Sequence, residues 1–176
     1  MQIQRLEEFQ IDNNLQQLIR DLLGECFSEY PEDRSYFRQL PDFRYLAWKE
    51  QQLAAHMGVE HRIINNDGQL SRIFGIIDLC VAPLFQHQKL ATKMLHLLEQ
   101  LAMDHGIDFL VLVAKEDDFY TLNGFQVVDN RCRWLVIHDD QTFGITSRSL
   151  HQSLLVKATG EMQWRPGLTD FLGHIF

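Results

Sequence analysis

The stretch DLCVAPLFQHQKLATKMLHLLE, residues 78–99, decides the fold. It begins in an apolar run that ends at Pro83, which cannot donate a hydrogen bond to a strand ladder. A short polar loop follows, and over residues 88–105 apolar side chains recur at three- and four-residue spacing. Gly106 stands where a helix C-cap is expected. The stretch therefore predicts a strand, a tight loop and a helix.

The loop between this strand and this helix is a candidate anion site. The first N–H groups of a helix have no acceptor in a preceding turn, and they carry a partial positive charge that suits a pyrophosphate. Lys89 or Lys93 would add positive charge beside them. Many strand-to-helix loops bind nothing, so a purely structural loop is the alternative at this point.

On both sides of this stretch the sequence predicts further strands. Downstream, IDFLVLVA (residues 107–114) is almost entirely apolar, which is typical of a central strand that is covered on both faces. Upstream, residues 43–48, 52–64 and 70–81 are expected to form three antiparallel strands, and the turn at residues 65–68, NNDG, favours a hairpin between the last two. A strand, a helix and a buried strand make a βαβ unit beside this antiparallel run.

The rest of the chain adds shorter elements. Asn13 or Asn14 would cap a helix over about residues 14–28, whose apolar residues recur at helical spacing. We also expect strands at 3–9, 125–128 and 133–138, a candidate short helix at 33–40, a short helix at 117–122 and a less regular C-terminal region. The sequence therefore predicts an α/β fold with one mixed, mostly antiparallel central sheet that is flanked by helices.

Composition limits the class of protein. A chain of 176 residues, 45% hydrophobic and 23% charged, predicts one globular domain, 1–176, in which residues 141–176 form a C-terminal segment on the substrate side or over a sheet edge. A formal net charge of −8 disfavours nucleic acid and anionic membranes as partners and suits a cationic small molecule. No apolar run approaches the ~20 residues that span a bilayer. Three widely spaced cysteines favour a cytoplasmic location.

Two motifs resemble those of the acetyl-CoA-dependent N-acetyltransferases of the GNAT superfamily. In that family a strand that ends Val-x-Pro is followed by Arg/Gln-x-x-Gly-x-Gly/Ala. Here VAP (residues 81–83) precedes Gln86, Lys89 and Ala91, with Lys89 in place of the middle glycine. The second motif, FYTLNGF (residues 119–125), is similar to the family's Phe-Tyr-x-x-x-Gly-Phe and follows the next predicted strand, as in the family. The resemblance spans about Leu6 to His138.

The resemblance implies an acyl-CoA N-acyltransferase fold and acetyl-CoA as cosubstrate. It also implies that the backbone of the strand end pairs with the pantetheine arm and polarises the thioester oxygen, while the loop amides hold the pyrophosphate. The implied CoA-binding residues are Leu79, Cys80, Val81, Gln86, His87, Gln88, Lys89, Leu90, Ala91 and Thr92. At Lys89 two outcomes stay open: the side chain either obstructs close approach of the backbone or reaches a phosphate.

Two residues are catalytic candidates for proton transfer. The resemblance implies that Tyr120 lies near the CoA sulfur and protonates the departing thiolate; a packed tyrosine is the alternative. Asp78 would accept the amine proton, directly or through water, since many members of the family carry an acidic residue there. The alternative for Asp78 is a carboxylate that orders a neighbouring loop. Period-two alternation places Asp78 and Cys80 on one face of the strand.

The remaining reactive side chains do not favour covalent or metal chemistry. Cys80 has no identifiable histidine partner, and buried cysteines usually serve packing. His56 and His61 lie five residues apart on one predicted strand, so alternation sends them to opposite faces, and no cysteine or carboxylate cluster joins them. We therefore expect no metal site and no covalent intermediate. Either histidine is an alternative candidate for the base.

The sequence limits the acceptor only loosely. Several acids follow the first predicted helix, and Glu29 and Asp33 among them are the substrate-binding candidates. They would attract a polyamine or an amino sugar, and a solvated charged face is the alternative. The tail, residues 154–176, is similar to tails of aminoglycoside 2′-N-acetyltransferases, and AAHMG (residues 54–58) to a segment of the nodulation acyltransferases. These two likenesses suggest an amino-sugar amine or an acyl group larger than acetyl.

Together these features predict an enzyme. We expect a monomer or homodimer that transfers an acetyl group from acetyl-CoA to a primary amine of a small molecule by direct attack. The alternatives are a non-catalytic acyl-CoA-binding or regulatory module and an N-acetyltransferase that acts on a protein or peptide.

Overall fold

A computed structural model of the protein describes residues 2–176. The chain divides into two compact units, one made of Met1–Glu60 and Ile76–Leu97 and the other of His61–Gly75 and Leu98–Phe176. The elements that contribute residues to both units are the strands β3 (Gln52–Asn66) and β4 (Gln69–Val81) and the helix α2 (Leu90–Asp104).

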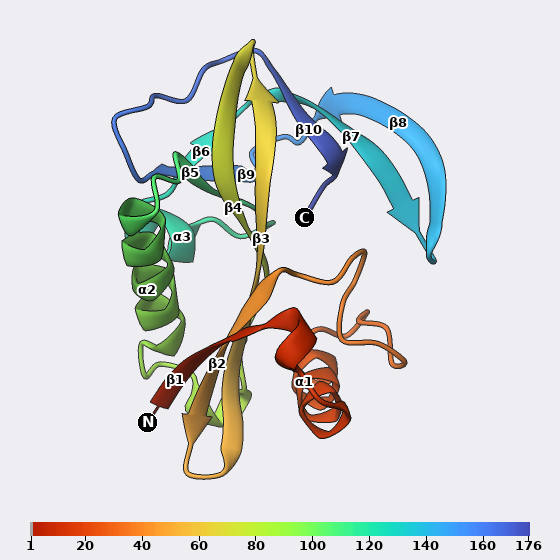
Figure 1. Cartoon of the computed structure of the whole chain (residues 1–176), viewed down its shortest axis with the longest axis vertical. Coiled ribbons are helices and arrows are strands. Elements are labelled where there is room, and N and C mark those ends of the chain that lie inside the picture. The colour runs from red at the N-terminus through yellow and green to blue at the C-terminus, as the bar shows by residue number, and fades with distance from the viewer. Residues whose placement is uncertain (1) are drawn as a thin grey trace. The chain divides into compact units, whose positions relative to one another are not determined.

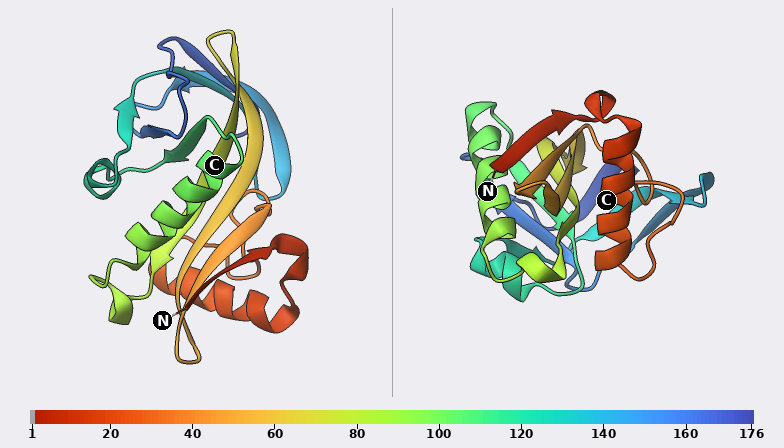
Figure 2. Two further views of the ribbon diagram at one scale, coloured as in Figure 1. Left: turned by 60° about the vertical axis from the view of Figure 1, so that its left-hand side comes forward. Right: turned by 90° about the horizontal axis from the view of Figure 1, so that it is seen from below.

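The first unit is built on an antiparallel run of strands. β1 (Gln2–Glu7) pairs with β2 (Phe43–Lys49), and β2 pairs with the first half of β3 (Figure 1). Two short 3-10 helices, η1 (Glu8–Gln10) and η2 (Pro83–Phe85), follow β1 and β4. In the right-hand view of Figure 2, α1 (Asn13–Cys26) and the first turns of α2 lie on opposite sides of these strands.

Helix α1 follows the predicted pattern closely. Its apolar face is buried at Ile19, Leu22 and Leu23. The side chain of Asp12 caps the helix, because its Oδ1 accepts a hydrogen bond of 2.8 Å from the N–H of Leu15. The cap is therefore this aspartate and not one of the two asparagines that follow it.

The second unit holds most of the remaining strands. They are β5 (Phe109–Val113), β6 (Gln126–Val128), β7 (Arg131–His138), β8 (Gln141–Ser149), β9 (Leu154–Ala158) and β10 (Leu168–His174), together with the short helix α3 (Asp118–Leu122). β4 and β5 run parallel, and β9 pairs antiparallel with both β5 and β6. β7 and β8 form a hairpin, and β10 runs parallel to β7. The buried core of this unit is made of Ile64, Ile73, Phe109, Val111, Cys132, Trp134, Leu154, Val156, Phe171 and Ile175.

The strand order confirms the predicted fold class. Hydrogen bonds join the strands in the order β6-β9-β5-β4-β3-β10-β7-β8, while β2 pairs with β3 and β1 with β2. The β4–β5 and β10–β7 pairs are parallel, and the β1–β2, β2–β3, β3–β10, β5–β9, β6–β9 and β7–β8 pairs are antiparallel. The sheet is therefore mixed and mostly antiparallel, with few helices, as the sequence predicted.

Several predicted elements were wrong in detail. The candidate helix at 33–40 is a series of turns and bends, and the region after residue 140, which we expected to be irregular, supplies β8, β9 and β10. The turns that connect these last strands use left-handed residues other than glycine, at Asp139, Asp140, His151 and Gln152. Such turns carry little sequence signal, so the strands between them were hard to predict.

Candidate active site

The end of β4 departs from regular strand geometry at Asp78. This residue has φ +51°, in the left-handed region that a side chain with a Cβ adopts only at a cost. Side chains on a strand alternate only while every residue stays extended. The alternation from which we predicted a common face for Asp78 and Cys80 is therefore interrupted at the first of the two, and their common face stays a prediction.

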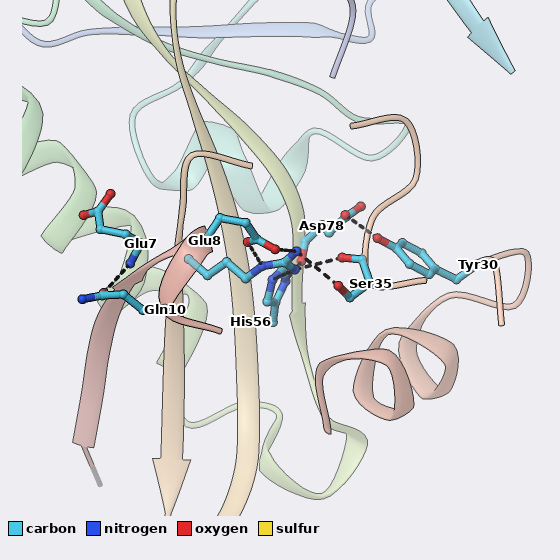
Figure 3. A network of polar contacts seen from close by, with 8 residues as sticks. Glu7, Glu8, Gln10, Tyr30, Ser35, His56 and Asp78 are labelled. Carbon is cyan, nitrogen blue, oxygen red and sulfur yellow. Dashed lines mark hydrogen bonds and ion pairs between the residues drawn. The ribbon is translucent and has the colours of Figure 1, made fainter. Parts of the chain in front are cut away.

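The carboxylate of Asp78 is held by a tyrosine that the sequence did not single out. Tyr30, in the segment after α1, donates a hydrogen bond of 2.7 Å from its hydroxyl to Oδ2 of Asp78 (Figure 3). The Tyr30 ring is buried and packs near Phe27 and Phe37, with ring centroids 6.0 Å apart in both pairs. The hydroxyl that meets the carboxylate is therefore carried by a fixed ring.

The backbone of Asp78 is held by His56 of β3. Nδ1 of His56 lies 2.9 Å from the carbonyl oxygen of Asp78, and Nε2 lies 3.0 Å from NH1 of Arg44 (Figure 3). A guanidinium can only donate, so Nε2 must be the acceptor and Nδ1 must carry the proton that goes to the carbonyl. Burial and the nearby Arg44 lower the pKa of His56 to about 3. His56 is therefore a neutral donor, which speaks against the alternative that it is the base.

Arg44 is the fully buried cation behind this arrangement. Its Nε and NH2 reach the two carboxylate oxygens of Glu8 at 2.6 and 3.1 Å, and NH1 donates to the carbonyl of Ser35 at 2.9 Å. A buried charge is tolerated when it is paired and its donors are satisfied, as here. The polar chain thus runs from Glu8 through Arg44 and His56 to Asp78, entirely within the first unit.

The surroundings of Asp78 make it a stronger base than an ordinary carboxylate. Burial raises its pKa, and this outweighs the opposite effects of the Tyr30 hydrogen bond and of the charges on Arg44 and Arg38. Glu60 raises the pKa of Asp78 a little further. A carboxylate with a raised pKa is better matched to accepting a proton near neutral pH.

The loop after β4 contains two left-handed residues. His87 and Lys89 have φ +60° and +59°, a backbone conformation that favours glycine. The N–H of Ala82 anchors the strand end on the carbonyl of Ala54 at 2.9 Å. Residues 86–89 are exposed. At position 89 a lysine thus stands in a backbone conformation that favours glycine.

The start of α2 presents unpaired amides in the place predicted for an anion. The first backbone hydrogen bond runs from the N–H of Lys93 to the carbonyl of Lys89, at 3.0 Å. The amides of Leu90, Ala91 and Thr92 therefore belong to the first turn and have no acceptor within the helix. These donors, beside an exposed lysine at the end of a helix of 15 residues, fit a pyrophosphate.

The two cysteines of the first unit lie together. The thiols of Cys26, at the end of α1, and Cys80 are hydrogen bonded to each other, and this contact together with burial raises the pKa of Cys80 well above its ordinary value. Its thiol is therefore protonated at neutral pH. This agrees with the prediction that Cys80 is not a nucleophile.

Tyr120 belongs to the second unit, so its surroundings are described within that unit. It lies in α3, where its ring packs edge-on against Phe119 and Phe125 with centroids 5.1 and 5.8 Å apart. Gly124 has φ +86°, a turn that lets Phe125 enter the core. The glycine and phenylalanine of the second motif thus fix the turn that follows the tyrosine.

The two substrate candidates lie on the exposed segment that follows α1. Glu29 and Asp33 are both exposed, and Tyr30 between them reaches Asp78. The sequence analysis did not predict this contact of Tyr30, and the substrate-binding role of Glu29 and Asp33 stays a prediction. The signal for the rest of the network was the buried Arg44 inside the apolar run FRYLAW, since a charge in such a run needs partners.

The part of the chain that the structure describes offers no cluster of metal ligands and no membrane-spanning helix. Over residues 2–176 no group of three or more His, Cys, Asp or Glu side chains is placed to hold a metal ion. Within the same residues, none of the helices has the length and apolar character needed to cross a membrane.

The family model described as Acetyltransferase (GNAT) family matches residues 13–125. No curated protein matches the chain. Among solved structures, the GNAT family N-acetyltransferase YhbS from Escherichia coli, crystallised in complex with CoA, is 16% identical with a TM-score of 0.64, over 97% of this chain and 90% of YhbS. An acyl-CoA N-acyltransferase from Pseudomonas aeruginosa is 15% identical with a TM-score of 0.59, over 89% of this chain and 99% of that one.

A larger protein is also similar. Eis1 from Mycobacterium abscessus is 12% identical with a TM-score of 0.63 over 73% of this chain, which spans only 32% of Eis1. At such identities the structural likenesses show the fold. The family model covers more than half of the sequence, including the loop after β4 and the FYTLNGF motif. The chain therefore belongs to the acetyltransferase (GNAT) family, whose reaction is acyl transfer from CoA.

Proposed function

We propose that the protein transfers an acetyl group from acetyl-CoA to the primary amine of a small molecule. The observation that carries this proposal is the junction of β4 and α2. There, a partly buried carboxylate at Asp78 and an open helix N-terminus after Lys89 lie at the two ends of one short segment.

In this proposal the junction binds the cosubstrate. The amides of Leu90, Ala91 and Thr92 hold the pyrophosphate, and the exposed residues 86–89 border it. The backbone of residues 79–81 pairs with the pantetheine arm. Of the two outcomes left open for Lys89, we propose that it reaches a phosphate, since its backbone already has the conformation the loop needs.

The amine attacks in its neutral form: as its nitrogen forms a bond to the carbonyl carbon of the thioester, Asp78 accepts the proton that this nitrogen loses, directly or through one water. The carbon–sulfur bond then breaks, and proton exchange with water afterwards restores Asp78 and Tyr120. Tyr120 donates its phenolic proton to the leaving thiolate, so that the products are an amide and neutral CoA thiol. General acid and base steps of this kind contribute about 10²- to 10⁴-fold each to a rate.

The acceptor we propose is a cationic amine such as a polyamine or an amino sugar. Glu29 and Asp33 supply exposed negative charge on the segment that Tyr30 joins to Asp78. A net charge of −8 favours the same class of acceptor. The substrate-side role of residues 141–176, the single-domain organisation and the cytoplasmic location stay predictions.

Calorimetric titration of acetyl-CoA, CoA and longer acyl-CoA esters, followed by a turnover screen with polyamines and aminoglycosides, tests the proposal. We expect binding in the micromolar range and thiol release with at least one amine. Binding without turnover on any small amine or peptide would favour the non-catalytic module. Turnover on peptide amines alone would favour the protein N-acetyltransferase. No binding would contradict the cosubstrate itself.

Two conservative variants test the assigned roles. Asp78→Asn and Tyr120→Phe should each lower kcat by about 10²- to 10⁴-fold and leave the affinity for CoA unchanged. Tyr45→Phe, which removes a hydroxyl from a buried tyrosine of β2, is the matched control. An unchanged kcat in either variant would remove that residue from the reaction.

A further inference from the structure

We propose that Tyr30 and His56 are positioning residues for Asp78, the first fixing its carboxylate and the second its left-handed backbone. This inference rests on the proposed function, in which Asp78 accepts the amine proton. Neither residue belongs to the two sequence motifs, and neither is assigned contact with a substrate.

The Tyr30 hydroxyl decides which carboxylate oxygen receives the proton. It donates to Oδ2 of Asp78 at 2.7 Å, and the buried ring that carries it is packed between aromatic neighbours. A carboxylate that is bound through one oxygen on a fixed partner loses rotational freedom. The geometry therefore assigns proton acceptance to Oδ1.

His56 holds the backbone of Asp78, whereas Tyr30 holds its carboxylate. A left-handed aspartate is unfavourable by itself, so a strand keeps one only where its surroundings enforce it. The Nδ1–H of His56 binds the Asp78 carbonyl at 2.9 Å, and Arg44 fixes the tautomer from the opposite ring nitrogen. His56 is fully buried, so water does not compete for these hydrogen bonds.

Charged and titratable groups reach Asp78 from several elements. The cations Arg44 and Arg38 and the hydroxyl of Tyr30 favour its charged form, while Glu60 opposes it. His56 is neutral, and the thiol of Cys80 on β4 is itself paired with Cys26. Of these groups, Tyr30 donates the hydrogen bond to the carboxylate itself, and Tyr30→Phe removes that bond without a change of charge. The full set is Cys26, Tyr30, Arg38, Arg44, His56, Glu60 and Cys80.

Tyr30→Phe is the decisive variant. The lost hydrogen bond stabilised the carboxylate, so we expect the Asp78 titration to move to higher pH. This is read by NMR of carbon-13-labelled aspartate carboxyls, with Asp78→Asn used to assign the signal. The acidic limb of kcat/KM should move in the same direction and kcat should fall about 10- to 100-fold, while KM for the acyl-CoA stays unchanged. Tyr45→Phe should move neither.

Two His56 variants test the backbone contact. His56→Asn keeps a donor near the position of Nδ1, whereas His56→Leu keeps none. We expect the asparagine variant to retain more of kcat than the leucine variant, with its pH limb near that of the wild type. Equal losses in two folded variants, as judged by circular dichroism, would overturn the role of His56.

The readouts separate this inference from the proposed function. If the wild-type protein is active and Tyr30→Phe shifts neither the Asp78 signal nor the acidic limb, the positioning role is overturned and the function stands. If the wild type transfers no acyl group, the proposed function fails and the positioning role fails with it, whatever the carboxyl titration shows.

Discussion

The two halves of β4 belong to one predicted strand but differ in backbone geometry and in burial. Ile73–Gly75 pair in regular register with β5 as Ile73↔Phe109, Phe74↔Leu110 and Gly75↔Val111, and these residues are buried. A few residues later, Asp78 is left-handed and the residues around it are only partly buried. Apolar packing therefore stabilises the first half, and polar contacts to side chains stabilise the second.

This difference has a physical basis. In the function proposed above, the end of β4 pairs with the cosubstrate and needs free backbone groups, which a regular partner strand would occupy. A break in the strand leaves such groups available, but the break is unfavourable unless other contacts enforce it. In this chain those contacts come from Tyr30, His56 and, behind them, Arg44. Substitutions that remove polar contacts should therefore destabilise the second half of β4, and substitutions that disturb packing should destabilise the first half.

The largest effect is expected from the buried ion pair. Arg44→Met leaves the Glu8 carboxylate and the Ser35 carbonyl without their donor, and we expect a loss of about 3–5 kcal/mol in the free energy of unfolding. Urea denaturation monitored by circular dichroism measures it. Arg133→Met breaks an ion pair that is half exposed at the arginine and should cost at most about 1 kcal/mol.

The double variant Arg44→Met with Glu8→Gln measures how much of the lost stability comes from the Glu8 carboxylate that is left without its cation. Removing the charge on Glu8 should recover part of the loss, because an uncompensated carboxylate is the main cost. Equal losses in Arg44→Met and Arg133→Met would mean that the polar chain contributes little to stability, and the contrast between the halves of β4 would fail.

The difference between apolar packing and polar contacts also explains which parts of the structure could be predicted from the sequence. The apolar half of β4, the run at 107–114 and the helix of α2 carry strong periodicity, and all three elements were correctly predicted. The site residues that we named from the loop and the motifs stay predictions. What sequence reasoning missed was the contact of Tyr30 with Asp78 and the left-handed φ of Asp78 and Lys89, because contacts over 48 residues and backbone strain leave no local pattern. For the same reason the strands β8, β9 and β10 were missed.

The next effect concerns packing in the first half of β4. A Cβ added at Gly75 would overlap Cε1 of Phe176, whose ring packs edge-on against Phe171. Gly75→Ala must displace that ring, and we expect a loss of about 1–3 kcal/mol in urea denaturation. Gly24→Ala is the matched control, since nothing lies within 4 Å of its new Cβ and a helical alanine should gain about 0.5–1 kcal/mol. A neutral Gly75→Ala would show that the C-terminal ring moves freely.

A pH effect should follow from His56. Its pKa is about 3 in the folded protein and 6.5 in the unfolded chain, so between these values the unfolded chain binds the extra proton. The contribution to stability is complete above pH 6.5 and is lost as the pH falls, by about 1.4 kcal/mol per pH unit. Urea denaturation at pH 6.5 and 5.5 should show a steeper loss for the wild type than for His56→Gln. Equal slopes would mean that the pKa of His56 is the same in the folded protein as in the unfolded chain.

The smallest effect tests the loop at the end of β4 through two lysines four residues apart. Lys89 is left-handed, so Lys89→Gly relieves strain, and after the entropy cost of glycine we expect a gain of about 0.5–1 kcal/mol. Lys93 lies inside α2, where Lys93→Gly should cost about 1 kcal/mol. Changes of opposite sign in the free energy of unfolding, measured by urea denaturation, would establish that Lys89 adopts a backbone conformation that favours glycine. A loss of stability in both would place Lys89 in an ordinary helical conformation, and the loop would then lack the shape on which cosubstrate binding depends.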